Sequence, residues 1–260
     1  MSAVRIAIPV ALGIFAIALW AFLVRHFAVP VYVLPSPADI WPAFTGNIAE
    51  LGAALWTTLK VTWAAFALAF VSAMALAVLF SMSRTLEMAL FPYAVVLQVT
   101  PVVAIAPLIL IWVGFDKVEI AALIIAWIVA FFPILSNATL GLRAVDPNLA
   151  DLFRLYGATR WQRLVRLQLP GALPYILSGV KVSGGLALIG AIMAEFVAGS
   201  GSATGLAWVI TEAGRNLQIA KMFAALGLLS AAGVLNFYAL TLLEWALLHR
   251  WHDSAVRRQV

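Results

Sequence analysis

The sequence predicts an all-α polytopic membrane protein with about six transmembrane helices. Hydrophobic residues make up 65% of its 260 residues and charged residues only 10%, whereas an average soluble domain is about half apolar and about a quarter charged. A water-soluble fold of this length cannot cover so much apolar surface. The apolar residues also gather in long runs, and a helix of roughly 20 such residues crosses a hydrocarbon core about 30 Å thick.

Six segments are long and apolar enough to be spans, or nearly so. They run from about Ile6 to Val24, Val61 to Met82, Glu87 to Asp116, Ile120 to Leu140, Leu173 to Phe196 and Met222 to Leu248. The first begins like a signal peptide, but its apolar run is long for one and no clear small-residue cleavage site follows. We therefore expect a retained anchor. No soluble domain or low-complexity tract interrupts the spans, so we expect one domain over residues 1–260.

Two of these spans carry a further pattern. In the second, alanine recurs at every fourth position from Ala65 to Ala77, which forms a ridge of small residues typical of ordinary helix packing. The third contains Pro92, Pro101 and Pro107. Proline bends a spanning helix and frees backbone carbonyls, so this segment is either a kinked packing helix or a pore-lining one.

The basic residues outside the spans indicate an orientation. One side of the membrane receives ten arginines: Arg5, Arg84, Arg143, Arg154, Arg160, Arg163, Arg166, Arg250, Arg257 and Arg258. The other side receives five basic residues: Arg25, Lys60, Lys117, Arg215 and Lys221. Loops rich in basic residues stay in the cytoplasm, so we expect both termini there. The net charge of +5 is explained by this topology and does not indicate a nucleic-acid partner.

Several site types are absent from the sequence. There is no cysteine, which excludes disulfides, thiolate metal sites and cysteine nucleophiles. The three histidines lie at predicted span ends, and no metal-ligand spacing such as HExxH occurs. No GxxxxGKS/T phosphate-binding motif exists, and the glycine-rich run at residues 199–205 lacks its lysine, so we expect an external turn there. We expect no catalytic residue, metal or cofactor in this chain.

The first external segment, residues 28–58, contains a helix start. Ser36 is placed to be the N-cap, Pro37 occupies the first helical position, and Asp39 can reach back to the cap. We interpret this helix as structural.

The longest predicted cytoplasmic loop, residues 143–170, has clear helix signals. Asp146 can cap a helix that begins at Pro147, and Gly157 supplies a left-handed residue to end it. The helix between them has about ten residues. Its apolar residues fall at i, i+3, i+4 and i+7, which places one apolar face on Leu149, Leu152, Phe153 and Tyr156.

A second stretch of this loop, from Thr159 to Leu169, carries Arg160, Arg163 and Arg166 and is expected to stop at Pro170. Two interpretations of the loop stay open on the pattern alone. One is a basic amphipathic segment that rests on anionic lipid. The other is a short knob that docks into a groove of a cytoplasmic partner.

The stretch Asp151-Leu-Phe-x3-Gly157-x9-Leu167-x-Leu169-Pro170 resembles the signature loop of ABC-importer permeases, EAA-x3-G-x9-I-x-LP. The glycine, the final Leu-Pro and both intervals match. Aspartate replaces the glutamate, Leu152 and Phe153 replace the two alanines, and Leu167 replaces isoleucine. The alanine positions depart most, which implies a bulkier fit to a partner groove.

The resemblance extends over nearly the whole chain. Leu34-Pro-Ser-Pro-Ala38, Leu173-Pro-Tyr-Ile176 and Ala194-Glu195 all resemble the nitrate/sulfonate/taurine-type permeases. One departure is Gly205-Leu206-Ala207, where that family usually has Gly-Leu-Gly. Together these motifs favour docking as the role of the loop.

The resemblance implies an ABC-importer permease fold in the inner (plasma) membrane, with a cytoplasmic coupling helix. In that family two permease chains, here expected to be identical copies, form the pathway. Two ATP-binding subunits dock below and bind the ATP, and an external binding protein delivers the solute. The coupling residues that the motif implies are Asp151, Leu152, Phe153, Gly157, Leu169 and Pro170. Asp151 is expected to pair with a base of the partner, Gly157 to set the turn, and Pro170 to fix the return into the bilayer.

Two ionisable residues, Lys181 and Glu195, lie in the fifth span and point to nearly the same helix face, near Gly184 and Gly185. These four residues are candidates for lining the pathway, because intramembrane charges are costly. The alternatives are that Lys181 extends to the cytoplasmic interface and that Glu195 meets external water.

The resemblance suggests a small anion such as nitrate, taurine or an alkanesulfonate as the solute, or else a pyrimidine or flavin compound. The rival function is an ion-coupled secondary transporter, which often has repeated halves and midplane charges. The sequence shows no obvious repeat and few such charges.

Overall fold

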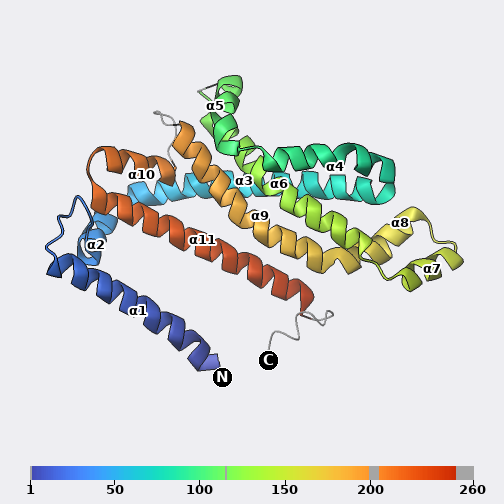
Figure 1. Ribbon diagram of the computed structural model, residues 1–260, viewed down its shortest axis with the longest axis horizontal. Coiled ribbons are helices and arrows are strands. Elements are labelled where there is room, and N and C mark those ends of the chain that lie inside the picture. Colours follow the sequence, from blue (N-terminus) through green and yellow to red (C-terminus); the bar gives the residue numbers. More distant parts are fainter. Residues whose placement is uncertain (1, 115, 199–204, 250–260) are drawn as a thin grey trace. The chain divides into compact units, whose positions relative to one another are not determined.

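The computed structural model describes residues 2–114, 116–198 and 205–249, and these residues form helices joined by short connections (Figure 1). In chain order the elements are α1 (Ser2–His26), α2 (Pro37–Gly46), α3 (Ile48–Met82), α4 (Arg84–Val99), α5 (Val102–Val113), α6 (Val118–Arg143), α7 (Pro147–Leu155), α8 (Arg160–Arg163), the π-helical turn η1 (Leu164–Gln168), α9 (Leu169–Ala198), α10 (Leu206–Arg215) and α11 (Ile219–Leu248). No strand occurs among the described residues. The predicted all-α class is confirmed.

The chain divides into two compact units. The first comprises Met1–Thr57 and Thr204–Ala231, and the second comprises Thr58–Ala203 and Ala232–Val260. Two of the three boundaries fall inside α3 and α11, so each of these helices contributes to both units. The single domain expected over residues 1–260 stays a prediction. The predicted glycine-rich turn, apart from Gly205, and the basic C-terminal residues Arg250, Arg257 and Arg258 lie outside the described residues.

Within the first unit, a small apolar core forms where α3, α10 and α11 meet. Its buried members are Leu51, Ala54, Leu206, Val209, Ala224 and Ala225. The predicted start of α2 is confirmed: Ser36 is the N-cap, Pro37 follows it, and Asp39 Oδ2 accepts hydrogen bonds from the backbone N (2.9 Å) and Oγ (2.6 Å) of Ser36. These bonds satisfy donors that a helix start leaves open.

The core of the second unit is the pair α6 and α9, which run side by side (Figure 1). Glycine permits this approach. A Cβ on Gly190 would lie 2.6 Å from Ala126 Cα, and one on Gly179 would lie 2.8 Å from the Pro133 carbonyl oxygen. The alanine ridge of α3 packs in the same unit, and its members Ala65, Ala69, Ala73 and Ala77 have no exposed surface. Its interpretation as a packing surface is confirmed.

Among the described residues, five helices are long and apolar enough to cross a membrane, and one bent pair of helices brings the number to six if the pair is one span. The third predicted span is this pair, because α4 and α5 meet at 99° around Thr100 and Pro101. Proline has no N–H to continue the ladder and forces the residue before it into an extended conformation, as Thr100 shows with ψ 128°. The expected bend is present and sharp, and the choice between a packing and a pore-lining role stays open.

The second predicted span also begins earlier than expected, at Ile48 rather than Val61. The added turns carry Glu50, Thr57 and Lys60. Such residues lower the mean hydropathy of the segment without ending the helix. The apolar run therefore begins later in the sequence than the helix does.

Candidate coupling site

The site is the connection between α6 and α9, which contains α7, α8 and η1. α7 begins as predicted. Asp146 is its N-cap and accepts a hydrogen bond from the backbone N of Asn148 at 2.8 Å, and Pro147 occupies the first helical position. An acceptor at this point satisfies one of the free N–H groups of the first turn.

α7 also ends as predicted, at a glycine in the left-handed conformation. Gly157 has φ +66°. Its N–H donates to the Arg154 carbonyl (3.0 Å), and the next N–H, of Ala158, donates to the Phe153 carbonyl (2.9 Å). This pair of bonds is a Schellman motif. A Cβ at Gly157 would meet nothing within 4 Å, so the constraint on this position is the backbone angle and not space.

The apolar face of α7 is uncovered. No residue of this nine-residue helix is buried. Leu149 is 47% exposed, Leu152 45% and Tyr156 83%. Beside this face lies a hollow of about 300 Å³, lined by Leu152, Phe153, Tyr156, Ala158, Gln162 and Arg166. Exposed apolar residues gathered on one side of a helix are typical of a surface that binds another protein.

After the glycine, the chain re-enters the helix and does not stop at Pro170. Thr159 caps α8 through a reciprocal pair of bonds with Gln162, of 3.2 and 2.8 Å. The helix then continues through η1 into α9, so the predicted stop at Pro170 is wrong. In η1 the Leu169 N–H donates to the Leu164 carbonyl, five residues back. Proline lacks an N–H and crowds the carbonyl four residues earlier, and a widened turn just before it accommodates both defects.

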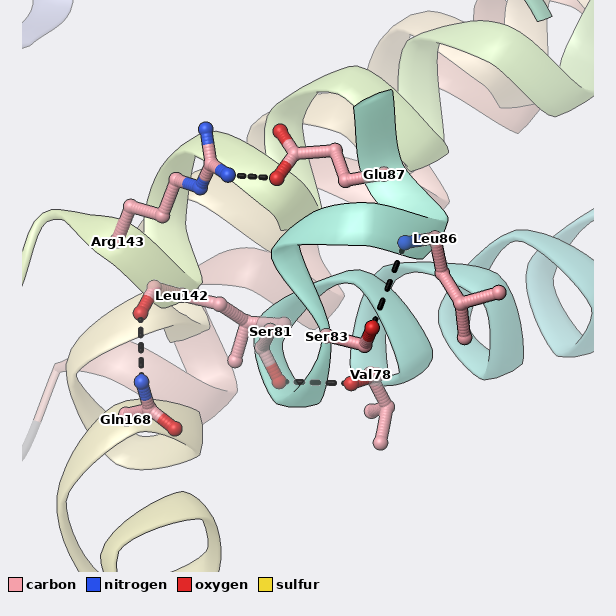
Figure 2. Close-up of polar contacts among 8 residues, drawn as sticks. All are labelled: Val78, Ser81, Ser83, Leu86, Glu87, Leu142, Arg143 and Gln168. Carbon is pink, nitrogen blue, oxygen red and sulfur yellow. Dashed lines mark hydrogen bonds and ion pairs between the residues drawn. The ribbon is translucent and has the colours of Figure 1, made fainter. Parts of the chain in front are cut away.

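Long-range contacts fasten the base of the connection (Figure 2). Arg143, the last residue of α6, forms an ion pair with Glu87 of α4, whose side chain is largely buried. One residue earlier, the Leu142 carbonyl accepts a hydrogen bond from Gln168 Nε2 at 3.3 Å. Arg160 Nη1 donates to the Met82 carbonyl at 3.3 Å. These contacts join the end of α6 to α4 and to η1, and the end of α3 to α8.

Two residues of this base, Glu87 and Gln168, were not predicted from the sequence as site residues. Glu87 carried a signal, because it is the single acid between Glu50 and Asp116, and an isolated carboxylate in an apolar stretch is retained for a partner. Gln168 carried none.

The other residues of the predicted motif take no part in these polar contacts. Asp151 is exposed and forms an ion pair with Arg154, one turn along α7, at 3.2 Å. An exposed pair of this kind contributes little to stability, so Asp151 remains available to another partner. Leu169 and Pro170 are half-buried at the start of α9.

The four candidate pathway residues separate into packed and exposed positions. Gly184 is buried, a Cβ there would lie 2.1 Å from Leu240 Cδ1, and its carbonyl accepts a hydrogen bond from Asn236 Nδ2 at 2.9 Å. Gly185 is exposed, with open space around its Cα. The pathway role of these glycines stays a prediction, and in this conformation Gly185 alone of the two is accessible.

The two charged candidates have partners within the second unit. Lys181 forms an ion pair with Glu244 of α11, and its Nζ lies 5.8 Å from the centre of the Phe237 ring. Glu195 is only 5% exposed, and its Oε1 accepts a hydrogen bond from Thr58 Oγ1 at 2.8 Å. The burial of Glu195 contradicts the interpretation that it meets external water. Lys181 is paired with α11, and its extension to the cytoplasmic interface stays a prediction. A buried ionisable side chain needs a partner. Here both partners come from other helices, so the sequence of one helix does not reveal them.

A model of the family described as "binding-protein-dependent transport system inner membrane component" matches residues 66–257. The chain belongs to this family. The match contains the whole coupling site, while α1 and α2 lie before it. This membership makes the chain a multi-pass inner-membrane permease of the ABC-importer type, a family that works with an ATP-binding subunit and a binding protein. The alternative function expected from the sequence, an ion-coupled secondary transporter, is therefore ruled out.

Two similar relatives are permeases named for different solutes. The permease protein SsuC of Bacillus subtilis (strain 168), named for aliphatic sulfonates transport, is 32% identical over 92% of this chain and 85% of its own length. The riboflavin transport system permease protein RibX of Chloroflexus aurantiacus is 33% identical over 96% of this chain and 91% of its own length.

Among solved structures, a chain of the MetNI methionine ABC transporter in an inward-facing conformation matches with a TM-score of 0.68 and 20% identity, over 78% of this chain and 98% of that chain. This likeness shows the permease fold.

Proposed function

We propose that α7 is the coupling helix of this permease, which transmits the closure of a separate ATP-binding subunit to the spans that form the solute pathway. The observation that carries the proposal is an apolar helix face left uncovered by the described chain, on a helix whose two ends are both fixed by caps. The ATP is bound by the separate subunit and not by the permease. Asp151, Leu152 and Phe153 form the contact surface, and Gly157, Leu169 and Pro170 set its angle to the membrane.

The base contacts support this role because a docking element transmits a displacement only if it is rigidly joined to what it moves. The Glu87–Arg143 ion pair joins the end of α6 to α4, and the Gln168–Leu142 hydrogen bond joins it to η1. A force applied to α7 therefore reaches both α6 and α9, the packed pair at the centre of the second unit. A loop without these contacts would bend instead.

The turn at Gly157 tests the coupling role. Replacing Gly157 with Val places a β-branched side chain at φ +66°, which costs about 1–2 kcal/mol and favours a different exit from α7. We expect membrane insertion and basal ATP hydrolysis to persist, while uptake per ATP falls about tenfold in proteoliposomes with the ATP-binding subunit and binding protein. Gly157→Asn is the matched control, because asparagine tolerates the left-handed region. Unchanged solute uptake in the valine variant would rule out the assignment.

The orientation that coupling requires is testable because the chain has no cysteine of its own. Leu155, at the end of α7, is 84% exposed, and Leu217, in the turn before α11, is 71% exposed. In intact cells we expect Leu217→Cys to react with a membrane-impermeant maleimide and Leu155→Cys to react only after the membrane is opened. Labelling of Leu155→Cys from outside would place α7 on the wrong side for an ATP-binding partner. Both termini are proposed to lie on the α7 side.

We further propose that two identical copies of this permease form the pathway, and that a separate binding protein selects the solute. The relatives named for aliphatic sulfonates and for riboflavin are nearly equally similar to this chain, so similarity alone does not choose between a small anion and a flavin or pyrimidine compound. Lys181 is already engaged by Glu244, which supports selection outside the membrane. Calorimetry on the binding protein that is recovered by pull-down with the permease, with taurine and riboflavin as ligands, decides between the two classes.

A further inference from the structure

A hollow rich in arginine lies at the base of the coupling site, apart from the apolar face of α7. Two adjoining cavities, of about 460 and 760 Å³, share Ser81, Arg84, Arg163 and Gln168 in their walls. Their walls contain five arginines: Arg84, Arg143, Arg154, Arg160 and Arg163. Figure 2 shows part of the wall, where the turn between α3 and α4 faces the end of α6.

The positive charge of this hollow is only partly balanced. Glu87 pairs with Arg143 and Asp151 with Arg154. Within the described ranges no carboxylate pairs with Arg84, Arg160 or Arg163. The Nε of Arg163 is in addition buried without a hydrogen-bond acceptor. A buried donor without an acceptor is costly, and three like charges facing one space repel one another, so the hollow is suited to an anionic acceptor.

The hollow lies where spans end. Met82 is the last residue of the α3 span and Arg143 the last of the α6 span, and the walls are built around both. Trp161, next to Arg160, is 61% exposed, and tryptophan is enriched at the level of lipid headgroups. Met82 itself is 36% exposed beside the arginines. An anion held here therefore has apolar surface next to it.

We propose that this arginine hollow binds the phosphate of an anionic phospholipid headgroup. Guanidinium groups bind phosphate oxygens through paired N–H donors, and basic pockets at the ends of membrane helices suit lipid headgroups. The proposal goes beyond the coupling function: it assigns a ligand to the arginines that α7 docking does not use.

The alternative partner for these arginines is the ATP-binding subunit. On α7, the hollow is lined by Ala150 and Arg154, whereas the apolar face is centred on Leu149, Leu152 and Tyr156. At 100° per residue these two sets lie about 150° apart around the helix. A partner seated on the apolar face therefore leaves the hollow side of α7 open, which favours lipid.

The test is native mass spectrometry of the purified permease complex, delipidated and then mixed with phosphatidylglycerol or phosphatidylcholine in detergent. We expect the wild-type complex to retain phosphatidylglycerol in preference to phosphatidylcholine. In Arg84→Gln/Arg163→Gln the apparent affinity for phosphatidylglycerol should fall about fivefold per arginine, or about 25-fold in all. Arg166→Gln is the matched control, since Arg166 lies one turn further along and lines the hollow beside Tyr156 instead. It should retain the lipid.

Three outcomes would overturn the proposal. One is equal retention of phosphatidylglycerol by the wild type and the double variant. Another is inorganic phosphate binding as tightly as the lipid, which would make the ligand a free phosphate. The third is a double variant that keeps the lipid but loses the ATP-binding subunit, which would assign the arginines to the protein interface. If the double variant does not assemble, Arg84→Gln alone decides the question, because Arg84 is exposed and unpaired among the described residues, and a fivefold loss is expected.

Discussion

α7 and the α6–α9 pair are stabilised in different ways. α7 has nine residues, none of them buried, and its ends are set by Asp146 and Gly157. The α6–α9 pair has long helices whose facing residues are buried and whose glycines touch the opposite backbone. Local hydrogen bonds define α7, and tertiary packing defines the pair. The permease thus joins an element defined by its own end residues to one defined by packing against a second helix.

The largest effect is expected from disturbing the packed pair. In Gly190→Val, the new side chain would meet the Ala126 backbone at 2.6 Å, and the backbone cannot yield as a flexible side chain does. Overpacking of this kind costs about 3 kcal/mol. We expect a marked loss of thermal stability in detergent, measured by fluorescence-detected size exclusion. Gly185→Val is the control, because its Cβ would meet nothing within 4 Å. Equal stability of the two variants would mean that close packing does not define the pair.

An intermediate effect is expected at the junction between the two regions. Glu87→Gln removes the carboxylate that pairs with Arg143 from a largely buried site, which costs about 1–2 kcal/mol. Asp151→Asn breaks an exposed pair and should cost less than about 0.5 kcal/mol. Hydrogen exchange at the end of α6 measures the difference. If both variants exchange alike, the ion pair does not fasten the base of the connection.

The smallest effect concerns α2, a second short helix defined by its own cap. Hydrogen bonds from the Ser36 hydroxyl and then its backbone N–H lower the pKa of Asp39 below its ordinary value, and the charge of Arg25 adds to this. A lowered pKa means that the charged carboxylate is favoured in the folded helix. The cap is therefore fully present above the ordinary aspartate pKa and is lost as the pH falls through the lowered value.

Ser36→Ala should raise the pKa of Asp39 toward normal, which a carbon NMR titration of the carboxyl group measures. Thr45→Ala, in the same helix, is the control because its hydroxyl bonds Trp41 and Pro42 instead. A pKa of Asp39 unchanged by Ser36→Ala would show that the hydroxyl does not set it.

This contrast also explains what the sequence predicts and what it does not. The caps at Ser36, Asp146 and Gly157 were predictable because each depends on residues within one or two turns. The all-α class and most spans followed from apolar runs. The Glu87–Arg143 pair joins residues 56 positions apart in sequence, and the partners of Lys181 and Glu195 come from other helices. Such pairings depend on how helices pack, which no local pattern contains.

The five-residue turn η1 has a geometric consequence for the coupling site. An α-helix advances about 100° per residue, so the one extra residue that a π turn contains rotates everything before it by about that angle relative to everything after it. Arg160 and Arg163 therefore face a direction that a uniform helix leading into α9 would not give them. Deleting a single residue within η1 would turn these two guanidinium groups by about a quarter of a circle while leaving their distance from the bilayer almost unchanged.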